Sequence, residues 1–125
     1  GSIVIDERNS SGLCRPRAND ADPDCLVAVY TTNRSGPGQA PRQTQDLAFS
    51  SDGGRSWAQF EGNPVLDENR IDFRDPKVIW HGPTQRWIML LALPVERQVA
   101  FYASPDLRSW RRVGQFGPAG GTGGI

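Results

Sequence analysis

The stretch LAFSSDGGRSW occupies residues 47–57, and a related stretch, VAFYASPDLRSW, occupies residues 99–110. The phenylalanines of the two stretches are 52 residues apart and the tryptophans are 53 apart. Each stretch has a short apolar run, then a turn-forming segment, then a tryptophan, which is the order expected of a strand, a turn and a second strand. A repeat of about 50 residues that carries four strands is typical of a β-propeller blade. The two stretches therefore predict an all-β fold made of about two blades.

The first of these stretches contains the pattern S-x-D-x-G-x-[S/T]-W, which is known as an Asp box. Asp52 can accept hydrogen bonds from backbone N–H groups across a hairpin turn, and Gly54 can adopt a positive φ. Trp57 can pack between neighbouring strands. We interpret the motif as a structural feature at the outer rim of a blade, with no direct part in function.

The rest of the chain repeats short apolar runs between turn signals, and helical periodicity is nearly absent. These runs predict strands at residues 3–5, 26–31, 46–51, 56–60, 77–81, 87–93, 98–103 and 110–113, with loops at 33–38 and 62–72. They form two blade-like repeats, at about 1–63 and 73–117; a sandwich or jelly roll is the alternative fold. Propellers close with about 4 to 8 blades, so we expect an incomplete domain that continues beyond both ends.

Composition excludes several classes of function. The chain has 14 basic and 14 acidic residues, so its zero net charge argues against a surface that binds nucleic acid. The longest apolar run, residues 87–95, is far shorter than the roughly 20 residues of a membrane-spanning helix. No phosphate-binding glycine loop, nucleophile elbow or zinc signature is present, so we expect no cofactor and no metal.

The segment FRDPKV, residues 73–78, contains the strongest candidates for functional side chains. Arg74 and Asp75 are adjacent, and Pro76 restricts the backbone of Asp75. In one interpretation Asp75 only caps a turn before a strand. In the other, its carboxylate and the guanidinium of Arg74 bind vicinal hydroxyl groups of a sugar.

Cys14 and Cys25 lie eleven residues apart in a polar loop with no pair of histidines nearby, which argues against a metal site. They form a disulfide if the protein is secreted; otherwise they are two free thiols. His81 is expected to be a solvated turn residue, and Trp80 and Trp87 to belong to the core.

Several segments resemble glycoside hydrolase family 32, the invertases, levanases and inulinases. The start of the chain is similar to the end of an FSGSAV-type motif, and FRDPKV contains the RDP motif of the family. The ending resembles the levanase and exo-inulinase branch. The segments that carry the resemblance are GSIVID (1–6), NSSGL (9–13), LVAVYTTN (26–33), QDLAFSSDGGRSWAQFEGNP (45–64), FRDPKV (73–78) and ASPDLRSWRRVGQFGPAGGTGGI (103–125).

The resemblance implies a five-bladed propeller followed by a β-sandwich, and a retaining mechanism. The family's nucleophile is an Asp in an upstream WMNDPNG motif, and its acid/base is a Glu in a downstream WECP motif; this sequence contains neither. Asp75 corresponds to the aspartate that stabilises the transition state, and Arg74 corresponds to its partner, able to keep Asp75 ionised by lowering its pKa. Ser2 corresponds to a residue at the sugar-binding pocket.

We therefore expect a β-fructofuranosidase that releases terminal fructose from levan, inulin or sucrose, with this chain inactive by itself. The substrate class favours secretion, and the sequence carries no prediction of oligomeric state. Two alternatives remain: another propeller glycosidase of the sialidase type, suggested by the Asp box, and a non-catalytic propeller that binds glycans.

Overall fold

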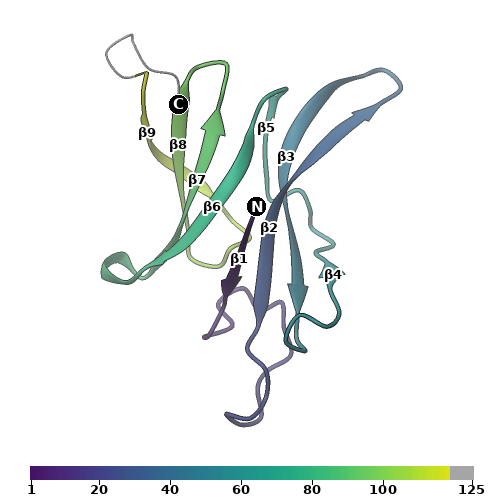
Figure 1. Cartoon of the computed structure of the whole chain (residues 1–125), viewed down its shortest axis with the longest axis vertical. Coiled ribbons are helices and arrows are strands. Elements are labelled where there is room, and N and C mark those ends of the chain that lie inside the picture. Colours follow the sequence, from purple (N-terminus) through teal and green to yellow (C-terminus); the bar gives the residue numbers. More distant parts are fainter. Residues whose placement is uncertain (119–125) are drawn as a thin grey trace.

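The computed structural model describes residues 1–118 as two antiparallel sheets side by side (Figure 1). The first sheet has the order β1 (Ser2–Ile5), β2 (Leu26–Gly36), β3 (Gln39–Ser50) and β4 (Ala58–Gln59), and β5 (Leu66–Arg70) also pairs with β3. The second has the order β6 (Arg74–His81), β7 (Arg86–Leu93), β8 (Gln98–Ser104) and β9 (Arg111–Phe116), with η1 (Gly82–Thr84) between β6 and β7. Residues 119–125, the glycine-rich end of the family-like stretch, lie outside the described residues.

The sequence repeat is confirmed as a structural repeat at the turns that follow β3 and β8. In the first turn the hydroxyl of Ser50 donates to Asp52 Oδ1 at 2.8 Å. In the second, Ser104 donates to Asp106 Oδ1 at 3.1 Å. Asp52 also accepts the N–H of Ser56, and Asp106 accepts those of Arg108 and Ser109, so one side chain holds each turn closed.

The tryptophan of each turn is held in the same way. The indole of Trp57 donates to the carbonyl of Gly54 at 3.0 Å, and that of Trp110 donates to the carbonyl of Leu107 at 2.7 Å. Gly54 has φ +92°, and Leu107 has φ +66° although it carries a side chain that disfavours this region. Leu107 is fully buried, and this burial offsets the strained backbone.

The core lies between the sheets and takes alternate side chains from both. The turn before β6 contributes Phe73, whose ring meets that of Tyr102 edge-on, with centroids 6.3 Å apart. Both side chains are almost fully buried. Other large members come from the first sheet, from β7 and from the turn after β8: Val27, Val29, Leu47, Trp87, Met89, Leu91, Leu93 and Leu107.

The two segments predicted as loops, 33–38 and 62–72, both contain strand residues. β2 runs through most of residues 33–38, β3 begins at Gln39, and β5 lies within 62–72. The prediction was wrong because these segments consist mainly of polar residues, which an apolar pattern does not mark as strand. Asn33 and Arg34 of β2, for example, pair with Gln43 and Arg42 of β3. The predicted strand at 56–60 shortens to β4, because the Asp box turn takes up its first residues.

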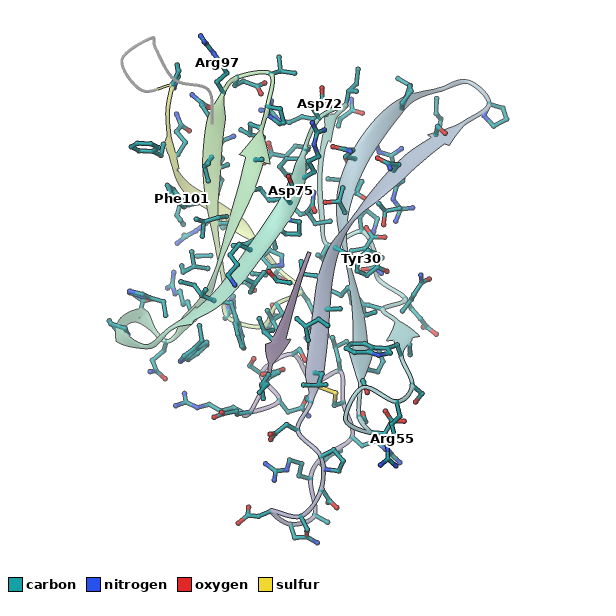
Figure 2. All side chains as sticks on the ribbon, in the orientation of Figure 1. Tyr30, Arg55, Asp72, Asp75, Arg97 and Phe101 are labelled. Carbon is teal, nitrogen blue, oxygen red and sulfur yellow. A yellow bond between two sulfur atoms is a disulfide. The ribbon has the colours of Figure 1, made fainter. Side chains whose placement is uncertain are left out.

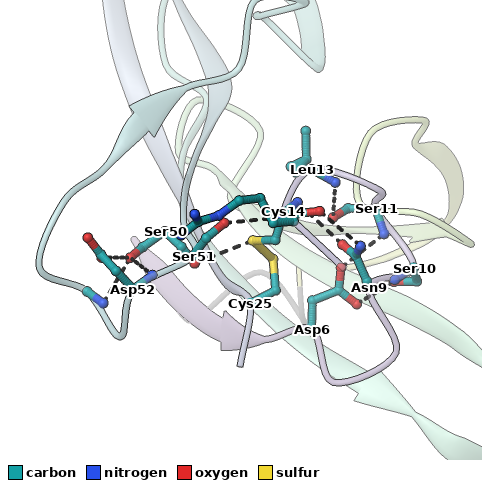
Figure 3. Close-up of a disulfide and its surroundings, with 12 residues drawn as sticks. Asp6, Asn9, Ser10, Ser11, Leu13, Cys14, Cys25, Ser50, Ser51 and Asp52 are labelled. Carbon is teal, nitrogen blue, oxygen red and sulfur yellow. Dashed lines mark hydrogen bonds between the residues drawn. A yellow bond between two sulfur atoms is a disulfide. The ribbon is translucent and has the colours of Figure 1, made fainter. Parts of the chain in front are cut away.

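Cys14 and Cys25 form a disulfide, with Cα atoms 5.7 Å apart (Figure 3). The loop before it is organised by the buried carboxylate of Asp6, which accepts the N–H groups of Ser10 and Ser11, both at 2.9 Å. Closing a loop of this size stabilises a fold by about 3 kcal/mol, chiefly by restricting the unfolded chain. Across residues 1–118 no helix has the length and apolar character needed to cross a membrane.

We expect Asp52→Asn to lower the melting temperature most at neutral pH. The hydroxyl and N–H of Ser56 and the hydroxyl of Ser50 hold the pKa of Asp52 far below its usual range. A lowered native pKa contributes stability above the unfolded value of about 3.9, and this contribution is lost as the pH falls further. The difference between melts of the two proteins should therefore stay constant from pH 7 to about pH 4 and narrow only below that, so the melts are extended to about pH 2. Asp20→Asn, on the exposed disulfide loop, is the control, and a pH-independent difference for Asp52→Asn would contradict the prediction.

Candidate active site

Asp75 stands out at the start of β6, where the strand bulges (Figure 2). Arg74 pairs with Ala92 and Lys77 pairs with Leu90, so the register shifts by one residue between them. Asp75 lies inside this bulge with φ +64°, a conformation that aspartate tolerates better than most residues. A proline follows it, which restricts the backbone further. Strain of this kind costs about 1–3 kcal/mol and is found most often at functional sites.

The bulge leaves Asp75 exposed on the wall of an open hollow of about 520 Å³. The hollow lies between β1 and β6, the first strands of the two sheets, and is lined by Gly1, Ser2, Ile3, Asp75, Pro76 and Lys77. Residues separated by more than 70 positions thus form one concave surface. The structure brings together Ser2 and Asp75, two of the residues predicted to form the site.

Ser2 joins β1 to β6 through its side chain. Its hydroxyl donates to the carbonyl of Pro76 at 2.9 Å and accepts the N–H of Val78 at 3.2 Å. The hydroxyl proton is therefore in use, and one lone pair remains for a ligand. Ser2 holds in place the two residues that follow Asp75.

Arg74 is not paired with Asp75, contrary to the expectation from sequence. Its Nη1 donates to Asp72 Oδ1 at 2.7 Å and to Gln43 Oε1 at 3.2 Å. Within residues 1–118 the carboxylate partner of Arg74 is Asp72. Successive residues of a strand point to opposite faces, and the bulge turns Asp75 away from its neighbour.

Lys77 is the cation that lines the hollow, and we did not select it from the sequence. It is the only lysine of the chain, and it lies two residues after Asp75 on an exposed position of β6. The strand periodicity of two, counted from Asp75, is the signal that could have identified it.

The other candidate residues lie away from this hollow. His81 is close to Thr84, with Nδ1 2.8 Å from the hydroxyl oxygen, in the turn after β6. Trp87 is in the core as predicted, whereas Trp80 is 36% exposed and lies beneath the guanidinium of Arg8, 5.5 Å from the ring centroid. In the described part of the chain, no three His, Cys, Asp or Glu side chains are grouped as metal ligands.

The hollow has the chemistry of a polyol site. An exposed carboxylate on a constrained backbone can accept hydrogen bonds from two hydroxyl groups at once, and its charge strengthens them. Lys77 supplies donors from the same wall.

Comparison with known proteins matches the whole chain, residues 1–125, to the model described as "Glycosyl hydrolases family 32 N-terminal domain". An extracellular exo-inulinase of Meyerozyma guilliermondii is 44% identical over 127 residues, covering 100% of this chain and 22% of the relative. An invertase of Schizosaccharomyces pombe is 40% identical, covering 98% of this chain and 20% of that protein. A levanase of Bacillus subtilis is 38% identical, covering 99% of this chain and 17% of that protein. The chain thus spans about a fifth of the length of these relatives.

Solved structures give the same result. The β-fructofuranosidase of Schwanniomyces occidentalis complexed with fructosyl-erythritol matches with a TM-score of 0.79 and 39% identity, over 93% of this chain and 21% of that one. The exo-inulinase of Aspergillus awamori matches with a TM-score of 0.76 and 31% identity, over 94% of this chain and 25% of that one.

Proposed function

Because the chain belongs to glycoside hydrolase family 32, we propose that the complete protein releases terminal fructose from β-D-fructofuranosides such as levan, inulin or sucrose. The observation that carries this proposal is Asp75, an exposed carboxylate held in a left-handed bulge on the wall of a concave site. The inulinase, invertase and levanase among the relatives support the substrate class.

In this proposal the bond-breaking groups come from parts of the protein outside this chain. A retaining glycosidase uses two carboxyl groups about 5–5.5 Å apart, one as nucleophile and one as acid/base. The family resemblance assigns these to an Asp and a Glu in motifs that the present sequence does not contain. We therefore expect residues 1–125 alone to release no fructose.

Asp75 acts on the sugar rather than on the bond. Its carboxylate accepts hydrogen bonds from fructosyl hydroxyl groups, and these bonds strengthen as the ring gains positive charge on the way to the oxocarbenium-like transition state. The effect appears in the turnover number because the interaction is stronger in the transition state than in the bound substrate.

Arg74 and Ser2 complete the proposed substrate-binding set. Arg74 uses Nη1 for its contacts with Asp72 and Gln43, and its other N–H groups are available for sugar hydroxyls. Ser2 contributes chiefly by fixing the segment that follows Asp75, since its proton is donated to Pro76.

In the same proposal the two sheets are neighbouring blades of a five-bladed propeller. The predicted bounds are about 1–63 and 73–117, and β5 extends the first sheet to Arg70. Both blades place their first strand, β1 or β6, beside the hollow. Such strands surround a common axis in a propeller, so further blades would complete the wall of the site.

We propose that the complete protein is secreted. The disulfide between Cys14 and Cys25 supports this, because such bonds persist in oxidising compartments. The exo-inulinase relative is described as extracellular.

The proposed function is tested by assaying the purified complete protein for fructose release from sucrose, inulin and levan, beside a synthetic sialoside. Fructose release without sialoside hydrolysis is the expected result. Hydrolysis of the sialoside alone would favour the sialidase alternative. Binding of fructans without hydrolysis would favour a glycan-binding propeller, and either outcome would overturn the proposal.

A further inference from the structure

Two glutamines of β3 hold the backbone of Phe73, the residue that precedes the site, through the peptide groups on either side of it. Gln43 Oε1 accepts the N–H of Phe73 at 2.8 Å, and Gln45 Nε2 donates to the carbonyl of the same residue at 2.7 Å. β3 and β6 belong to different sheets, so these side-chain amides take the place of a backbone ladder between them. Phe73 is the residue directly before Arg74 and Asp75.

Gln45 is fully buried, and both atoms of its amide are in use. Its Oε1 accepts the hydroxyl of Thr31 at 2.8 Å, while Nε2 donates to Phe73. A buried amide is tolerated only when its hydrogen bonds are made, so this arrangement has one orientation. Gln45 thus fixes the backbone at the entrance to β6.

Gln43 holds both the backbone and a side chain of the site. The Oε1 atom that accepts from Phe73 also accepts Nη1 of Arg74 at 3.2 Å, and Nε2 donates to Asn33 Oδ1 at 2.9 Å. The amide is therefore anchored on β2 and directs its oxygen at the site. The guanidinium of Arg74 is held between this oxygen and Asp72.

We propose that Gln43 is a positioning residue for fructoside hydrolysis, acting through Arg74, while Gln45 holds the peptide group that joins Phe73 to Arg74. The inference rests on the proposed function. The bulge at Asp75 needs such support, because a strained backbone persists only where its surroundings determine it. Small displacements of binding groups cost large factors in rate, so the hydrogen bonds of Gln43 have a kinetic consequence.

The test compares Gln43→Leu with Gln43→Glu in the complete protein. Leucine has a similar size but no acceptor, so we expect kcat/KM for sucrose to fall about tenfold, mainly through a higher KM. Glutamate keeps an acceptor oxygen for both Phe73 and Arg74, and its second oxygen can accept from the NH₂ of Asn33 once that amide turns over, so this variant should stay within about threefold of the wild type. Threonine favours strands, but its side chain is too short to reach Phe73 and Arg74. If the leucine variant does not fold, we therefore expect Gln43→Thr to show the same loss of kcat/KM.

A second measurement separates positioning from general stability. In an Arg74→Gln background, the change Gln43→Leu should have little further effect on KM, because the residue through which Gln43 acts is gone. Gln115→Leu is the matched control, since Gln115 Oε1 also accepts an arginine N–H, that of Arg112 at 3.0 Å, on β9. It should leave KM unchanged.

Two results would overturn the inference and leave the proposed function intact, provided that the wild type hydrolyses fructosides. One is wild-type kinetics for Gln43→Leu. The other is an increase in KM on Gln43→Leu that is as large in the Arg74→Gln background as in the wild type. An equal loss in Gln43→Glu would also overturn the inference. A wild-type protein that hydrolyses no fructoside would overturn the proposed function instead.

Discussion

Replacing Asp75 with asparagine in the complete protein is expected to lower the turnover number on sucrose and fructans by roughly two orders of magnitude. Asparagine adopts the left-handed conformation as readily as aspartate, so the bulge at φ +64° should persist. What is lost is the charge that strengthens the hydrogen bonds to the sugar in the transition state. That loss corresponds to about 3 kcal/mol of transition-state stabilisation.

Steady-state kinetics and a thermal melt of the same preparations check this prediction. The melting temperature should change little, because Asp75 is exposed. Asp24→Asn is the control: this aspartate forms a surface ion pair with Arg17 on the disulfide loop and should leave the turnover number unchanged. Near-normal turnover of the Asp75 variant would show that this carboxylate is not the transition-state stabiliser.

The second large effect is expected on stability. Phe73→Ala should lower the free energy of unfolding by about 3–5 kcal/mol, the range for removing a large aromatic side chain from a core. Phe73 is completely buried, lies edge-on to Tyr102, and belongs to the core cluster shared by both sheets. Its removal leaves a cavity beneath the segment that leads into the site.

Denaturant unfolding of the complete protein, compared with wild type, measures this difference. Val95→Ala is the control, because Val95 is 73% exposed in the turn after β7 and should cost less than about 0.5 kcal/mol. A loss below about 1 kcal/mol for Phe73→Ala would show that the ring does not occupy the core position in solution.

The repeat could be predicted from the sequence because its signal is local. The serine, aspartate and tryptophan of each turn act on backbone groups within a few residues, so their spacing alone identifies the turn. The conformation of Leu107 could not be predicted in this way. Its positive φ depends on complete burial of its side chain, which is a property of the tertiary structure.

The polar first half of β3 was not predicted as strand, because the contacts that stabilise it are not local in sequence. Thr44 and Gln45 are buried and hydrogen-bonded through their side chains, so no apolar alternation marks this part of the strand. The contacts of Gln43 and Gln45 with Phe73 join residues 30 and 28 positions apart, beyond the range of a local pattern.

Within the candidate site, the motif identified Asp75, but its neighbours depended on the fold. Adjacency in sequence suggested that Arg74 serves Asp75, whereas the bulge separates them and Asp72 takes the guanidinium. Ser2 reaches Pro76 over 74 positions, a contact that only the packing of β1 against β6 creates.

The most direct test of the central claim is a crystal structure of the complete protein with bound fructose. We predict that the sugar occupies the hollow between β1 and β6, with two of its hydroxyl oxygens about 2.5–3.0 Å from the carboxylate oxygens of Asp75. Fructose bound in the protein with no hydroxyl within hydrogen-bond distance of Asp75 would contradict the account.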